Sequence, residues 1–193
     1  MTKTREDGWQ LLTEFVQSDS LRRHCLAVET AMRAYARHFG ESEEEWGLVG
    51  LIHDYDYEIH PTLDQHPQAG IPLLRERGYP EWAIRAIESH ADHLDVPRET
   101  RLEQTLYAVD ELTGFIAAVA LVRPSRAVAE VTPQAVRKKM KDKAFARAVD
   151  RVAMTAGSEE LGVAFDDHVA FVAAAMTANA AALGLEGTPG NVG

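Results

Sequence analysis

Apolar residues recur at three- and four-residue spacing along most of this chain, and that spacing is the period of an α-helix. The clearest case is the segment 21–39, whose apolar side chains would share one face of a helix. That face carries Leu21, Cys25, Val28, Met32, Tyr35 and Phe39. Since we find no convincing run of alternating β-branched residues, the sequence predicts an all-α fold.

Residues that typically begin and end helices divide this pattern into about seven to nine helices. Ser42 followed by Glu45 is typical of a capping box, and Gly40 is typical of the residue that ends a helix. The expected helices cover 5–16, 21–39, 42–54, 66–78, 80–91, 99–122, a basic segment after Thr132-Pro133, and 158–183. Without a repeat or a break in composition, we expect one compact helical domain over 1–185 and a disordered tail at 186–193.

Composition excludes several classes of protein. Of the 193 residues, 46% are hydrophobic and 26% are charged, as in ordinary globular proteins. The most apolar window, 106–122, contains Asp110 and Glu111 and is short for a bilayer, so we expect a core helix and no membrane partner. No secretory signal is visible. The single cysteine, Cys25, excludes an intrachain disulfide and fits a reducing cytoplasm.

The charge of the chain bears on its partners. A formal net charge of -10 would repel a long polyanion, so we expect no binding to long nucleic acids. A small phosphorylated ligand remains compatible with this charge if cations gather locally. Association into a homo-oligomer stays open.

Four polar residues fall where the helical pattern expects core side chains. His24 shares the apolar face of its helix, His53 and Asp54 follow the apolar run Leu48–Ile52, and Asp110 lies in the most apolar helix. Burying such groups is costly unless they are paired or bind a cation. Two imidazoles and two carboxylates would form a mixed nitrogen and oxygen ligand set, which suits manganese, iron, zinc, cobalt or nickel better than calcium.

The order of these residues, His24, then His53-Asp54, then Asp110, resembles the H…HD…D signature of the HD-domain superfamily of metal-dependent phosphohydrolases. The resemblance covers roughly residues 21–122. It implies an all-α HD-type bundle with these four residues as metal ligands, and a divalent cofactor of one or two ions per chain, with magnesium as a further candidate.

Two more histidines bear on the number of metal ions. The segment HPQAG, beginning at His66, resembles the place where binuclear members supply an extra histidine. SHADH, which contains His90 and His93, stands where they supply another, often as a double histidine that is split here. The resemblance therefore makes His66 and His90 candidates for a second metal or for the substrate phosphate; His93, in the same segment as His90, could also be a solvent-exposed loop residue.

Candidate catalytic residues are Asp54, Glu58 and Lys139. A nucleotidase subgroup of the superfamily carries a glutamate three residues after the HD aspartate; here that position is Tyr57 and Glu58 follows it. Glu58 or Asp56 could act as an acid, a base or an acceptor for a ligand histidine, or simply face water. Lys139 belongs to the basic segment RKKMKDK, 137–143, which could grip a phosphate or be a solvated helix face.

The resemblance predicts a phosphohydrolase that cleaves a small phosphate ester, with a nucleotide as the first candidate, by means of a metal-activated water. Whether it would be a phosphomonoesterase or a phosphodiesterase is left open. Two alternatives remain: an HD-fold di-iron oxygenase, and a non-catalytic nucleotide-binding HD protein.

Overall fold

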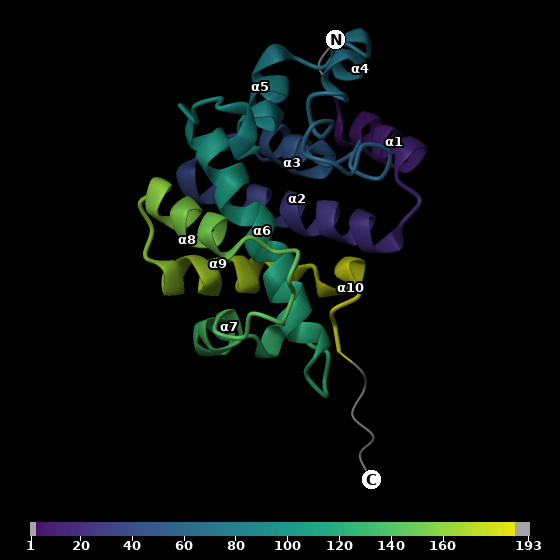
Figure 1. Cartoon of the computed structure of the whole chain (residues 1–193). Coiled ribbons are helices and arrows are strands. Elements are labelled where there is room, and N and C mark those ends of the chain that lie inside the picture. The colour runs from purple at the N-terminus through teal and green to yellow at the C-terminus, as the bar shows by residue number, and fades with distance from the viewer. Residues whose placement is uncertain (1–2, 188–193) are drawn as a thin grey trace. The chain divides into compact units, whose positions relative to one another are not determined.

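The computed structural model describes residues 3–187, and within them it confirms the all-α prediction. This part of the chain contains ten α-helices, two short 3₁₀ helices and one isolated bridge between Ala127 and Glu186 (Figure 1). Of the predicted tail, residues 188–193 lie outside the described residues. The chain divides into two compact units, Met1–Tyr107 and Ala108–Gly193.

Most of the helices belong wholly to one unit, and α6 runs through the boundary. The first unit contains α1 (Arg5–Phe15), α2 (Asp19–Phe39), α3 (Glu43–Ile52), α4 (Ile71–Glu76), α5 (Glu81–Ser89), η1 (Asp92–Leu94) and the beginning of α6 (Arg101–Leu121). The second contains the rest of α6, then η2 (Val128–Glu130), α7 (Pro133–Met140), α8 (Arg151–Glu160), α9 (Phe165–Ala178) and α10 (Ala180–Leu183).

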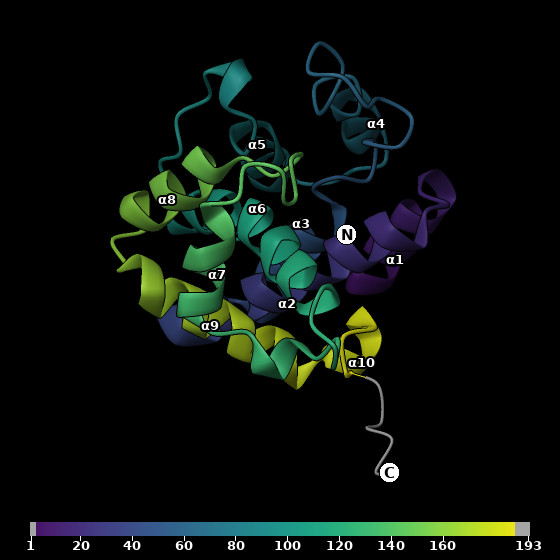
Figure 2. The same cartoon turned by 60° about the horizontal axis from the view of Figure 1, so that its bottom comes forward.

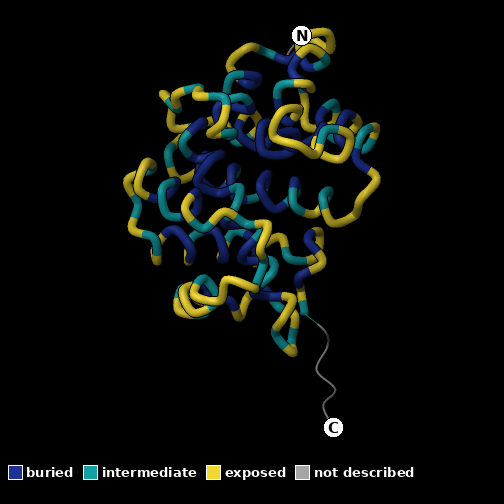
Figure 3. Tube along the Cα trace, in the orientation of Figure 1, coloured by how far each residue is buried: buried dark blue, intermediate teal, exposed yellow. Residues whose placement is uncertain are grey.

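Helix α3 is the centre of the first unit, and it packs against both α1 and α2. Every residue from Trp46 to Ile52 is buried (Figure 3). Two glycines allow the close approach: a Cβ on Gly8 of α1 would lie 2.6 Å from Leu48, and one on Gly50 would lie 3.0 Å from the backbone of Glu29 in α2. The burial of α3 holds its C-terminal end, and the two polar residues that follow, inside the unit.

Helix α9 is the centre of the second unit, where it contacts η2, α7, α8 and α10 (Figure 2). Gly157 of α8 lies against α6, because a Cβ there would come within 2.6 Å of the Cα of Ala108. No single described helix is both long and apolar enough to cross a membrane; α8 and α9 pass that test only together, with a bend of 99° between them.

Most predicted helices differ from the observed ones by one or two residues at an end, and two differ more. The prediction of one helix over 158–183 is wrong, because α8 begins at Arg151 and a left-handed Gly162 (φ +73°) separates it from α9. Of the predicted helix 66–78, only α4 is helical, and the residues before it form turns. Between α8 and α9 the chain bends by 99°, which the apolar spacing of the sequence does not reveal.

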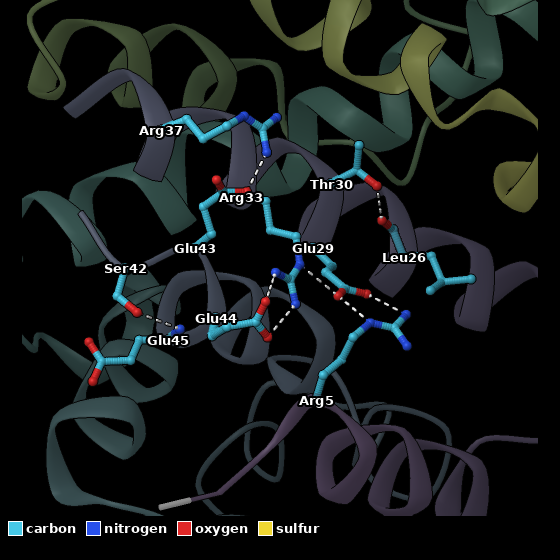
Figure 4. A network of polar contacts seen from close by, with 10 residues as sticks. All are labelled: Arg5, Leu26, Glu29, Thr30, Arg33, Arg37, Ser42, Glu43, Glu44 and Glu45. Atoms are coloured by element: carbon cyan, nitrogen blue, oxygen red, sulfur yellow. Dashed lines mark hydrogen bonds and ion pairs between the residues drawn. The ribbon is translucent and has the colours of Figure 1, made fainter. Parts of the chain in front are cut away.

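A buried carboxylate ties the first three helices together. Glu29 is only 4% exposed, and its two oxygens accept hydrogen bonds of 2.6 and 2.9 Å from Arg5 of α1 (Figure 4). The Arg33 guanidinium donates to Glu29 at 3.0 Å and, through its other nitrogens, to Glu44 of α3 at 2.8 and 3.1 Å. Charge-assisted bonds of this kind are the stronger ones in proteins.

We expect Glu29→Ala to lower the free energy of unfolding by about 2–3 kcal/mol, because it leaves two guanidinium groups without their shared acceptor. Glu44→Ala is the matched control: its side chain is 75% exposed, so a loss of roughly 1 kcal/mol or less is expected. Urea unfolding of both variants checks this, and equal losses would contradict the central role of Glu29.

Candidate metal centre

The candidate site of the first unit is assembled at helix ends. His53 is the C-terminal cap residue of α3, and Asp54 follows it directly. His90 is the cap residue at the end of α5, His66 lies in the turns before α4, and His24 comes from within α2. Segments far apart in sequence therefore contribute to the same cluster.

The first donor set joins His24, His53 and Asp54, whose ligand atoms lie within 4.8 Å of one another. His24 Nε2 is 3.6 Å from Asp54 Oδ2, and His53 Nε2 is 3.5 Å from Asp54 Oδ1. His53 is fully buried, whereas the His24 side chain is 22% exposed. A cation in this set would thus have a buried side and a side that is partly open.

The second donor set consists of Asp54, His66 and His90, also with ligand atoms within 4.8 Å of one another. Asp54 Oδ1 is 3.1 Å from His66 Nε2 and 3.7 Å from His90 Nε2, and the two imidazole nitrogens are 3.4 Å apart. Asp54 belongs to both sets. The structure therefore brings the predicted His66 and His90 to the same carboxylate as His24 and His53.

Hydrogen bonds on the other ring nitrogens orient three of the imidazoles. Nδ1 of His53 donates to the Gly50 carbonyl at 2.9 Å, and Nδ1 of His90 donates to the Ile87 carbonyl. Because a carbonyl oxygen can only accept, these two Nδ1 atoms carry hydrogen, and Nε2 is the atom left to face Asp54. Such outer hydrogen bonds are typical of metal-binding histidines.

The third imidazole has a carboxylate as its outer partner. His66 Nδ1 donates to Asp56 Oδ1 at 2.8 Å, and Asp56 is only 1% exposed. Asp56 Oδ2 is buried and has no hydrogen-bond partner among residues 3–187. Gly70 leaves room for this carboxylate, since a Cβ there would lie 2.7 Å from Asp56 Oδ2. Asp56 thus has the acceptor role for a histidine, one of the alternatives that the sequence left open.

The charges of the cluster depend on one another. Burial acts to raise the pKa of Asp54, but His53, His66, His90 and His24 outweigh it and hold that pKa well below its usual range. Burial likewise acts to lower the pKa of His66, whereas its bonds to Asp54 and Asp56 raise it from 6.5 to about 10. A buried carboxylate surrounded by imidazoles can thus stay ionised, as a metal ligand must.

These residues fit a divalent ion. Imidazole nitrogens with a shared carboxylate form a mixed donor set that suits transition metals, and two overlapping sets provide donors for one or two ions. The predicted fourth ligand, Asp110, lies on α6 three residues beyond the boundary between the units. Its part in the site stays a prediction.

Other predicted residues have different partners. Glu58 is exposed, and its Oε2 accepts hydrogen bonds of 2.9 Å from the backbone N–H groups of Gln17 and Ser18. Lys139 belongs to α7 in the second unit, with its Nζ 4.7 Å from the centre of the Phe145 ring. His93 Nε2 is 3.4 Å from Gln68 Oε1. The catalytic roles of Glu58 and Lys139 stay predictions.

Some features of the site have no signal in the sequence. The carbonyl groups of Gly50 and Ile87 accept from the ligand imidazoles, and any residue would supply such an oxygen. The Tyr57 ring stands edge-on to His66, with centroids 5.1 Å apart. Its place after the HD pair was visible in the sequence, but its contact with His66 was not.

Comparison with known proteins gives one result. Residues 21–114 match the model of the family described as HD domain. The matched segment contains His24, His53, Asp54, His66, His90 and Asp110. No curated protein and no solved structure matched the chain.

The metal-free protein should lose stability as the pH rises from 6.5 toward 10. The folded pKa of His66 is above its ordinary value, so the stabilisation is complete below pH 6.5 and is lost as the pH passes through about 10. Thermal unfolding in the presence of a chelator measures this, and His66→Gln should show a smaller decline. An identical decline in the two proteins would rule out His66 as its source.

Asp56→Asn should weaken metal binding by about 10- to 100-fold, because the imidazole of His66 loses its charged acceptor. In a His66→Ala background the same change should have little further effect, since Asp56 would act through His66. Asp64→Asn, in the same segment but exposed, is the control. Metal content after dialysis gives the readout, and additive losses in the double variant would contradict the coupling.

Proposed function

Because the chain belongs to the HD-domain superfamily, we propose that it is a metal-dependent phosphohydrolase that cleaves a small phosphate ester, with a nucleotide as the first candidate substrate. The observation that supports this best is the Asp54 carboxylate shared by two donor sets. The superfamily consists mostly of hydrolases, which supports hydrolysis in general. The identity of the phosphate ester, including its organic group, is part of this proposal.

We assign His24, His53, Asp54 and Asp110 as metal ligands, and His66 and His90 as ligands of a second ion or of the phosphate. The assignment of Asp110 rests on the order of the residues and on its inclusion in the matched segment. When bound, a divalent ion supplies a Lewis acid for a phosphoryl oxygen and lowers the pKa of a coordinated water. Manganese, iron, zinc, cobalt and nickel suit this donor set, and magnesium is a further candidate.

The residues of the chain prepare the site for this chemistry. Asp54 supplies negative charge in a buried place, and the outer hydrogen bonds of His53, His66 and His90 turn each Nε2 toward it. With the rings already oriented, little reorganisation is needed when an anion and a cation enter. Hydrolysis then adds water across the P–O ester bond, which breaks to give a phosphate product and an alcohol.

A second candidate function is oxidation of a substrate by dioxygen at two irons. The Asp54 carboxylate shared by the two donor sets supports a di-iron oxygenase and a binuclear hydrolase equally, because both functions need the second donor set. The two functions differ in their products. About two irons per chain together with oxygen uptake would select the oxygenase, whereas phosphate release with other divalent ions would select the hydrolase.

We expect His53→Ala and Asp54→Ala to lose the bound metal and to lower phosphate release at least about 100-fold, because each removes a donor from the cluster. His38→Ala, an exposed histidine of α2, should keep both properties. Elemental analysis, a phosphate-release assay over a nucleotide panel and circular dichroism check this. Full activity in either cluster variant would refute the proposal, as would tight nucleotide binding without turnover for every metal tried.

A further inference from the structure

Exposed apolar side chains gather in the segment that joins Asp54 to His66. Among the described residues, large hydrophobic side chains are exposed at Tyr57, Ile59, Leu63, Trp82, Leu121, Val122 and Val152. Three of them lie between Asp54 and His66, with Tyr57 at 44%, Ile59 at 47% and Leu63 at 73% exposure. Single exposed apolar residues are ordinary, but a group in one short segment often marks a binding surface.

This segment is held in place on both sides of Tyr57. The Tyr57 backbone N–H donates to the Asp54 carbonyl at 3.0 Å, so the ring is only one turn from the cluster. The adjacent Glu58 accepts from the Gln17 and Ser18 backbone at 2.9 Å, which ties the segment to the connection between α1 and α2. The His66 N–H donates to the Thr62 carbonyl at 2.8 Å. The backbone is therefore anchored on both sides of Tyr57.

The Tyr57 ring borders the cluster directly. It meets the His66 ring edge-on, with an interplanar angle of 86° and centroids 5.1 Å apart. His66 Nε2 in turn lies 3.1 Å from Asp54 Oδ1. A phosphate held at the cluster is covalently joined to its organic group, so that group must extend from the cluster, and the exposed Tyr57 ring lies against one of the imidazoles that border it.

We propose that Tyr57 is a specificity-determining residue that stacks on a flat aromatic group of the phosphate ester. This inference rests on the proposed phosphohydrolase function and narrows its substrate class. An aromatic side chain binds another aromatic ring by stacking or by edge contacts. It has no net charge with which to bind a charged organic group, so an aromatic group is the better match. Ile59 and Leu63 extend the apolar character of the same segment.

The test uses two esters that differ in a ring: benzyl phosphate and ethyl phosphate, whose alcohol leaving groups have similar acidity. We expect the metal-loaded wild-type protein to prefer the benzyl ester in kcat/KM. Tyr57→Ala should reduce that preference about tenfold, a typical loss when a stacking ring is removed. Tyr57→Phe should retain the preference, because it keeps the ring.

Controls separate stacking from a structural role. Metal content of Tyr57→Ala should equal that of the wild type, and Trp82→Ala, which removes a comparably exposed aromatic ring from α5, should keep the preference. If Tyr57→Ala lowers kcat/KM equally for both esters, Tyr57 only supports His66 and the inference fails. If the wild type is a dimer that Tyr57→Ala dissociates with an unchanged preference, the ring belongs to an interface and the inference also fails.

Failure of the proposed function would give a different result. Wild-type protein that binds metal but releases phosphate from neither ester, nor from any nucleotide or phosphodiester of a wider panel, would refute hydrolysis itself. Hydrolysis with equal kcat/KM for the two esters would leave the proposed function intact and refute only the role of Tyr57.

Discussion

One ionised carboxylate, buried among imidazoles, is the constraint on which the candidate site depends. Asp54 follows a helix whose sides are covered, so water cannot solvate it fully, and its charge requires partners from the protein or from a bound cation. Nitrogen atoms of four histidines lie within reach of it. Burying the Asp54 charge would be costly without these partners, which come from α2, from the ends of α3 and α5 and from the turns before α4.

The same local device appears at two helix ends. His53 ends α3 and donates to the carbonyl of Gly50, and His90 ends α5 and donates to the carbonyl of Ile87, in both cases three residues back. The last carbonyls of a helix have no partner within the helix, so an imidazole at the cap residue can satisfy one of them. Each bond also orients the remaining ring nitrogen toward Asp54. Helix termination and ligand orientation are thus achieved by one interaction.

The segment between Asp54 and His66 combines several roles. The buried Asp56 accepts a hydrogen bond from the His66 imidazole, and Glu58 binds the backbone of the α1–α2 connection. Tyr57, which lies between them, exposes its ring at the surface. One short segment thus supports the cluster, fastens itself to the α1–α2 connection and presents an exposed ring beside His66.

The sequence by itself determined the helical class, the inward position of His24 and the place of His53-Asp54 after a buried helix, because each follows from local spacing. It also contained the HD signature, which the matched segment 21–114 confirms. Only the tertiary structure showed that His66 and His90 reach the same carboxylate, that Asp56 is the acceptor for His66, and that a left-handed Gly162 interrupts a predicted helix. The spacing of apolar residues indicates which side of a helix is buried. Contacts between segments joined by turns depend on the direction in which the backbone leaves each turn, and the spacing does not indicate that direction.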